Sequence, residues 1–191
     1  MERRYAIAAA FLLAGMTGPV FAANMPSTMS DSTIMVGDAP MYPSHNIIQN
    51  AIHSADHTTL VAAVKAAGLV SALEGTGPFT VFAPTNEAFA DLPTGTVQTL
   101  LMPANKAELV KILEYHVVPG EYNTTKIRSM IIAGGGKATL KTLEGEPLTL
   151  EMNGSSNIIV RDVKGDVADI TIADVTQSNG VIQVIDHVLM P

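Results

Sequence analysis

The chain contains no cysteine and no tryptophan, and aromatic residues make up only 5% of its 191 residues. The absence of cysteine excludes disulfides, thiolate nucleophiles and cysteine-ligated zinc or iron–sulfur sites. Charged residues are also sparse, at 15%, and acidic residues outnumber basic ones, which gives a formal net charge of −7. Because an acidic surface repels phosphate backbones, nucleic acid is not an expected partner.

The first residues have the pattern of an export signal. Arg3 and Arg4 precede an apolar run over residues 5–14, and small residues follow at the positions that a signal peptidase reads. Spanning a bilayer takes about 20 apolar residues, more than this run supplies, so a membrane anchor is the weaker alternative. We predict a signal peptide over residues 1–22, a secreted or periplasmic protein, and no transmembrane segment after cleavage.

Residues 23–44 show neither the period of a helix nor that of a strand, and they are rich in methionine, proline and serine. This composition predicts a flexible spacer. Thioethers are also possible ligands for Cu(I), and His45 lies close by, so weak metal binding at this end of the chain stays open. The methionines concerned are Met25, Met29, Met35 and Met41.

Residues 45–191 are predicted to form one domain whose first half is helical. Apolar side chains recur at the spacing of a helix face, and Asp56 and Asn105 stand where N-caps are expected, Asn105 in a capping box with Glu108. The predicted helices cover residues 47–52, 57–67, 86–92, 96–102 and 106–116, and one strand, over residues 79–82, lies among them.

The second half of the domain has the pattern of a strand meander. Its segments alternate or are rich in β-branched residues, and glycine-containing turn signals separate them. Asn179-Gly180 is the dipeptide that best fits a tight hairpin turn. The predicted strands cover residues 138–143, 147–152, 157–163, 170–175 and 181–189. Helices first and strands later predict an α+β fold.

Three segments, in this order, resemble the fasciclin domain family. GPFTVFAPTNEAF over residues 77–89 is similar to the first signature segment of the family, EYHVV over residues 114–118 to its central Tyr-His segment, and GVIQVIDHVLMP over residues 180–191 to its closing strand. The resemblance implies N-terminal helices packed on a β-wedge or sandwich built mainly from the C-terminal half. One departure is Gln183, which stands where the family often has histidine, so no role of that histidine carries over.

The Tyr-His segment supplies the candidate site residues. His116 lies on the apolar face of the predicted helix, where a buried imidazole needs a hydrogen-bond partner. The resemblance implies that His116 is structural and links the helix to the neighbouring signature segments. Exposed residues beside it are expected to contact a partner, notably Tyr115, Val117 and Val118, together with the exposed part of Thr85-Asn86.

Patterns that would carry catalysis or strong metal binding are missing from the sequence. There is no G-x-S-x-G elbow for a serine nucleophile. His53 and His57 are spaced like two zinc ligands, but a helix-cap signal falls between them, which favours solvated histidines. A weak divalent-ion site remains an alternative to outward-facing strand residues for a group of aspartates that lacks the register of a calcium loop. These are Asp162, Asp166, Asp169 and Asp174.

Asn123 and Asn153 each begin an acceptor sequon for N-glycans, whose use the sequence does not decide. Taken together, the patterns predict a non-enzymatic protein without a cofactor. Since fasciclin domains are associated with adhesion, the resemblance implies an exported interaction module that binds a protein or cell-surface ligand. The alternative is a carrier of a small apolar or lipid ligand, because an aliphatic domain could leave a groove between helices and sheet. An exported hydrolase is the least supported reading.

Overall fold

The computed structural model describes residues 33–191. The predicted signal peptide over residues 1–22 lies outside this part of the chain, as does the first half of the predicted spacer with Met25 and Met29. Within residues 33–191, no helix is long and apolar enough to cross a membrane.

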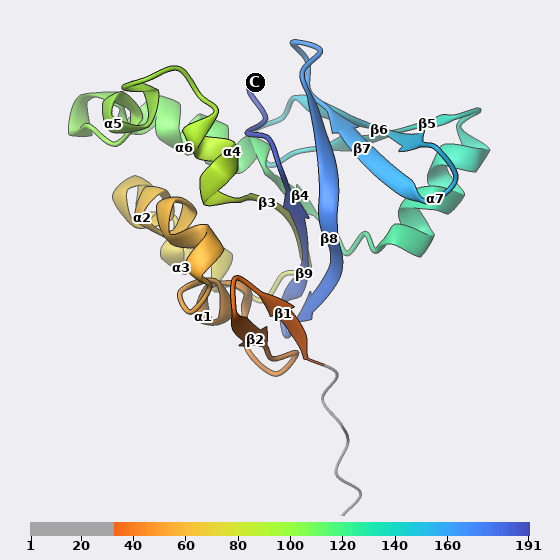
Figure 1. Ribbon diagram of the computed structural model, residues 1–191, viewed down its shortest axis with the longest axis horizontal. Helices are drawn as coiled ribbons and strands as arrows, with labels where there is room; N and C mark the ends of the chain where they lie inside the picture. The colour runs from red at the N-terminus through yellow and green to blue at the C-terminus, as the bar shows by residue number, and fades with distance from the viewer. Residues whose placement is uncertain (1–32) are drawn as a thin grey trace, which may run out of the picture. The chain divides into compact units, whose positions relative to one another are not determined.

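The central sheet contains seven strands, which are β3 (Phe79–Pro84), β4 (Val117–Pro119), β5 (Lys137–Lys141), β6 (Pro147–Asn153), β7 (Asn157–Arg161), β8 (Val167–Gln177) and β9 (Gly180–Ile185). Their order is β4-β3-β9-β8-β7-β6-β5 (Figure 1). β3 and β9 pair in parallel, and the other neighbours pair antiparallel. Just after β5, the N–H of Leu143 donates to the carbonyl of Val117 at 2.8 Å, which brings the two edges of the sheet together.

The described part of the chain also contains seven α-helices, which are α1 (Ile47–Ala51), α2 (Thr58–Ala67), α3 (Val70–Leu73), α4 (Asn86–Ala90), α5 (Thr96–Leu100), α6 (Lys106–Tyr115) and α7 (Thr124–Ala133). Short 3-10 turns occupy Ala55–His57 and Pro103–Asn105. Helices α1 to α6 gather on one side of the central strands, whereas α7 lies on the other side against β5 and β6 (Figure 1). The fold is therefore α+β, with helices in the first half and most strands in the second, as predicted.

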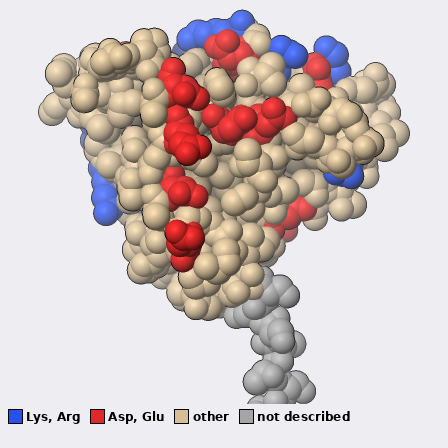
Figure 2. Space-filling view, viewed as in Figure 1, with Lys and Arg blue, Asp and Glu red and all other residues tan. Residues whose placement is uncertain are grey.

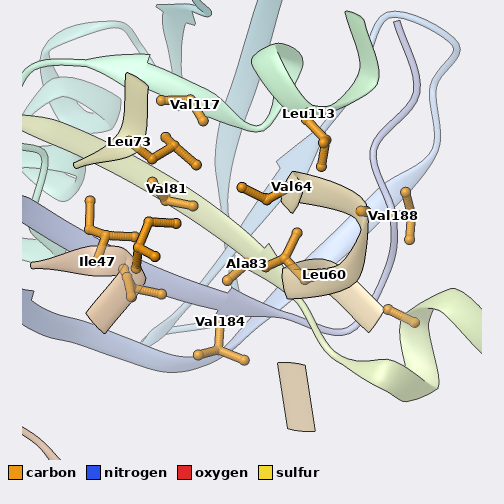
Figure 3. Close-up of a cluster of buried hydrophobic side chains, with 14 of the residues drawn as sticks. Ile47, Leu60, Val64, Leu73, Val81, Ala83, Leu113, Val117, Val184 and Val188 are labelled. Atoms are coloured by element: carbon orange, nitrogen blue, oxygen red, sulfur yellow. The ribbon is translucent and has the colours of Figure 1, made fainter. Parts of the chain in front are cut away.

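Two buried clusters form the core, and β3 contributes to both. Val81 and Ala83 face the first cluster, between the sheet and helices α1 to α6, whereas Phe82 faces the second, beneath α7. Figure 3 shows side chains of the first cluster gathered between the helices and the strands. Because β3 is covered on both faces, its sequence is a continuous apolar run rather than an alternating one.

Part of the predicted spacer is structured. Strands β1 (Ile34–Val36) and β2 (Ala39–Met41) form a hairpin, and Val36, Ala39 and Met41 are buried in the first core cluster. The turn residues Gly37 and Asp38 have φ values of 57° and 60°, which is the backbone that a two-residue hairpin turn of this kind requires. The spacer prediction is wrong for this segment, and the domain begins before residue 45.

The structure also differs from the expected helices. Helix α7 lies in a segment for which no helix was predicted, and it begins at an Asn123 cap whose side-chain oxygen accepts from the N–H of Lys126 at 2.9 Å. The predicted cap Asp56 is wrong, whereas Asn105 does occupy the N-cap position of α6 but without the predicted capping box. Asp56 lies inside a 3-10 turn, and the side-chain amide of Asn105 donates instead to the carbonyl of Thr99 at 2.7 Å.

Candidate functional site

The Tyr-His segment passes from the end of α6 into β4 and is buried. Tyr115 is 0% exposed, and Val117 and Val118 are also buried. The expectation that these three side chains are exposed is wrong, because the segment lies between the two core clusters: Val117 packs in the first cluster, and Tyr115 and Val118 pack in the second. Residues at this point of the fold support the surface around them and do not themselves form it.

The hydroxyl group of Tyr115, at the end of α6, connects this helix to two parts of the sheet. The hydroxyl donates to the carbonyl of Pro147 at 3.0 Å and accepts from the N–H of Val163 at 3.1 Å. Burial raises the pKa of Tyr115 to about 12, so the phenol stays protonated at physiological pH. Tyr115 therefore fixes the start of β6 and the turn after β7 relative to α6.

His116 has a backbone partner at each ring nitrogen. Nδ1 donates to the carbonyl of Ile112 at 2.8 Å, and Nε2 accepts from the N–H of Leu189 at 3.0 Å. Burial lowers the pKa of His116 to about 4, against smaller opposing effects of the Ile112 carbonyl and the Asp162 charge. The imidazole is neutral at pH 7 and links α6 to the closing segment, which is the arrangement that the resemblance implies.

Asp162 holds the next residue of the closing segment. Its Oδ2 accepts from the N–H of Met190 at 3.0 Å, and its Oδ1 accepts from the N–H groups of Lys164 and Asp166, each at 2.9 Å. The Asp162 carboxylate thus stabilises the turn that follows it. It also fixes the backbone of Met190, next to Leu189, which is bound by His116. The sequence pattern favoured an outward-facing strand position for Asp162. This expectation is wrong, because Asp162 is buried.

Asp174 and Gln183 form a separate polar network between β8 and the loop before α7. Asp174 has a φ of 58°, and its Oδ1 accepts from the N–H of Thr124 at 2.7 Å and from the Gln183 amide at 2.8 Å. The same amide donates to the carbonyl of Tyr122 at 3.2 Å. Gln183, which stands where the family often has histidine, is therefore a fully buried connecting residue.

The structure brings together no candidate metal ligands within the described residues. No group of three His, Asp or Glu side chains between residues 33 and 191 has the geometry to hold an ion. His57 is buried, and its Nδ1 lies 2.9 Å from the Ser54 hydroxyl, whereas His53 is exposed. Burial lowers the pKa of His57, so the expectation of two solvated histidines is wrong for this one.

Thr85 and Asn86 are half-buried and make internal contacts. The hydroxyl of Thr85 accepts from the N–H of Ala88 at 3.3 Å and so caps α4. The Asn86 Oδ1 accepts from the N–H of Thr59 at 3.0 Å, and its Nδ2 donates to the carbonyl of Ala55 at 2.8 Å. Asn86 therefore ties α4 to the start of α2, and its amide has little capacity left for a partner.

Two apolar side chains beside the Tyr-His segment are exposed. Leu143, whose N–H donates to Val117, is 44% exposed, and Val163, whose N–H donates to Tyr115, is 47% exposed. The predicted contact residues include neither Leu143 nor Val163, because each stands next to a turn, where an isolated apolar residue has no periodicity to assign it to a face. The signal that could have found them is their position directly beside Glu144-Gly145 and Lys164-Gly165 turns.

Replacing Tyr115 with phenylalanine is expected to lower the free energy of unfolding by about 2 kcal/mol, because the Val163 N–H and the Pro147 carbonyl lose a buried partner. Urea denaturation at pH 7 measures the change. Tyr42→Phe is the matched control, since Tyr42 is 40% exposed and its change should stay within about 0.5 kcal/mol. Equal effects of the two substitutions would contradict the role given to the Tyr115 hydroxyl.

These features meet in one architecture: parallel central strands covered on both faces, a buried Tyr-His segment, and a closing segment clamped by His116. The family model described as the fasciclin domain matches residues 55–191. The chain therefore belongs to the fasciclin domain family.

Similar proteins occur in bacteria and animals. The chain is 44% identical to protein sll1483 of Synechocystis, with 90% of this chain and 91% of that protein covered. It is 34% identical to the immunogenic protein MPB70 of Mycobacterium bovis, covering 74% and 66% of the two chains. It is 36% identical to the transforming growth factor-beta-induced protein ig-h3 of Sus scrofa, of which it spans only 21% while 83% of this chain is covered.

A solved structure shares the fold. It is a FAS1 domain pair from the insect cell adhesion molecule fasciclin I, with a TM-score of 0.70 and 18% sequence identity. The match covers 78% of this chain and 52% of the pair, so the chain spans about half the length of that structure.

Proposed function

We propose that the protein is an exported, non-enzymatic interaction module that acts at the cell surface or in the periplasm, in adhesion or in contacts with a matrix. The family membership, the export pattern of residues 1–22 and the fold shared with an insect cell adhesion molecule support this function. The two backbone contacts of the His116 ring support a structural histidine over a general base.

The single observation that carries the proposal is the exposed apolar pair Leu143 and Val163. Both backbones are anchored to the buried Tyr-His segment, so their side chains are presented by rigid supports. A side chain on a rigid support loses little conformational entropy when a partner buries it, which favours binding. The contact surface of the module is thus the turns after β5 and β7, and not the segment beneath them.

Charge adds a second preference. Acidic side chains run down the middle of the face seen in Figure 2, whereas basic side chains lie mostly toward its rim. Together with a net charge of −7, this distribution favours a protein partner with a basic surface over a phosphate-rich one.

The test uses fluorescent beads coated with the purified chain and intact cells of the source organism. The double substitution Leu143→Asp and Val163→Asp is expected to reduce bead attachment at least tenfold, because it introduces charge into an apolar contact. Flow cytometry of the cells counts the attached beads.

Ile132→Asp is the matched control for this experiment. Ile132 is 78% exposed on α7, away from the Tyr-His segment, and its substitution should leave attachment unchanged. Native beads that do not attach to cells, or a double variant that attaches as the native chain does, would refute the proposal.

A further inference from the structure

An apolar cavity of about 70 Å³ lies between helices α1, α2, α3 and α6 and the strands β3 and β4. Its walls include Leu73, Val81 and Val117, which Figure 3 shows gathered between the helices and β3. Native interiors are packed at the density of organic crystals, with few voids larger than a water molecule. A cavity of this size in the larger of the two core clusters is therefore unusual.

The walls are almost entirely aliphatic. His116 is the one buried side chain with ring nitrogens among the lining residues, and both nitrogens are already engaged by backbone groups. A water molecule needs two to four polar partners to occupy a buried site, and the buried side chains of these walls offer none that is free. The chemistry of the walls favours a hydrocarbon occupant.

The cavity reaches the surface at one end. Lys65, Ala72 and Leu143 are exposed and also line it, and the half-buried Glu114 stands with them. The mouth therefore carries one positive and one negative side chain. A ligand with a polar end could leave that end in water while its apolar part enters.

A second, smaller cavity of about 30 Å³ continues inward. It shares Ile47, Ala51, Leu60 and Val81 with the first, so only these side chains separate the two spaces. Its walls are apolar except for His57, and they end beside the β1–β2 hairpin at Val36 and Met41, which belong to its lining. The two spaces are small and share four lining residues, which suits a chain better than a ring: the first is about half the ~150 Å³ cavity that accommodates benzene in another protein.

We propose that this cavity is a binding site for one linear alkyl chain of a single-chain amphiphile, which enters beside Lys65 and Leu143 and extends toward Ala51 with its polar end left at the mouth. The site shares Leu143 with the proposed contact surface, whereas Val163 does not line it, so substitution of Val163 alone distinguishes the two. Burial of each methylene from water contributes about 0.8 kcal/mol, so affinity should grow about fourfold with each added carbon until the space is filled.

Octan-1-ol is the probe, because its uncharged head removes any contribution of Lys65 or Glu114. Titration into the chain with ¹³C-labelled methyl groups is expected to give saturable shifts of methyl signals in the cavity walls, notably Leu73, Leu113 and Val117. Methyl groups of the second core cluster serve as the internal control and should not shift. These are Leu148, Leu150 and Val160.

Ala51→Leu is expected to weaken octan-1-ol binding at least tenfold, because Ala51 lines both cavities and a larger side chain fills the passage between them. Ala72→Leu is expected to block entry to the cavity at its exposed mouth. Because Ala72 is exposed, this substitution leaves the core unaltered. Ala133→Leu is the matched control, since Ala133 ends α7 as Ala51 ends α1 and lies outside both cavities.

Three results would each overturn the site: no saturable methyl shifts, equal shifts in both core clusters, or Ala51→Leu and Ala72→Leu variants that bind octan-1-ol as the native chain does. Reduced cell attachment together with intact octan-1-ol binding, both measured in the single Val163→Asp variant, would separate the surface function from the cavity.

Discussion

Replacing His116 with leucine is expected to lower the free energy of unfolding by about 3 kcal/mol at pH 7. The substitution leaves the Ile112 carbonyl and the Leu189 N–H without their partner inside the core, and each unsatisfied buried group costs about 1–3 kcal/mol, part of which the apolar leucine offsets. Urea denaturation followed by circular dichroism measures the difference from the native chain.

The same pair of proteins should differ in their response to acid. The folded chain holds the pKa of His116 at about 4, below its ordinary value of 6.5, so between these values the unfolded state binds a proton that the folded state does not. The His116 contribution is complete above pH 6.5 and is lost as pH falls toward 4, by about 3 kcal/mol in total. Protonation also removes the lone pair that accepts from Leu189.

The leucine variant lacks this titration, so the gap in stability between the two proteins should shrink from about 3 kcal/mol at pH 7 to near zero at pH 4. Effects of His57 and of the carboxylates are common to both proteins and cancel in the difference. His187→Leu, at an exposed position, is the control and should change stability by less than about 0.5 kcal/mol. A gap that stays constant with pH would contradict a neutral, buried His116.

The fold class could be predicted because its signals are local and strong. Residues 79–84 and 180–185 are apolar runs bounded by turn residues, and both prove to be central strands covered on two faces. The parallel pairing between them, with Phe79 opposite Gly180, joins segments about a hundred residues apart, and no local pattern encodes it.

The exposure of the Tyr-His segment could not be predicted from local pattern. Tyr115 and Val117 flank His116 at the point where a helix becomes a strand, so neither helical nor strand periodicity assigns these two residues a face. All three are buried because β4 and the end of α6 lie between the two core clusters, which is a property of the tertiary arrangement.

Helix α7 was not predicted because its capping residue, Asn123, was interpreted only as a glycan acceptor. Asn123 begins a glycan sequon, and the same side chain caps α7, whose buried residues Ile127 and Ile131 are four apart. Only these two residues of α7 are buried, so its apolar face is short. The β1–β2 hairpin was missed for a similar reason. Its turn residues Gly37 and Asp38 lie in a segment whose composition predicts a flexible spacer.

Asn179 also has a larger role than its sequence suggests. The Asn179-Gly180 dipeptide predicts a turn, and the turn is present, but Gln177 pairs with Gly180, so the loop residues are Ser178 and Asn179. The Asn179 side chain is buried: its Oδ1 accepts from the N–H of Ile47 at 3.0 Å, and its Nδ2 donates to the carbonyls of Leu73 and Gly75 at 2.7 and 2.9 Å. A loop residue thus holds α1 and α3 against β9.

Replacing Asn179 with alanine is therefore expected to lower the free energy of unfolding by about 4 kcal/mol, since three backbone groups, two in buried and one in a part-buried hydrogen bond, lose their partner at once. Asn153→Ala, in the exposed Asn153-Gly154 turn, is the control and should cost less than about 1 kcal/mol. Thermal and urea unfolding measure both variants, and equal losses would contradict the role of Asn179. Because α1 and α3 form walls of the apolar cavity, hydrogen exchange at the Ile47 amide should accelerate in Asn179→Ala, and octan-1-ol binding should weaken with it.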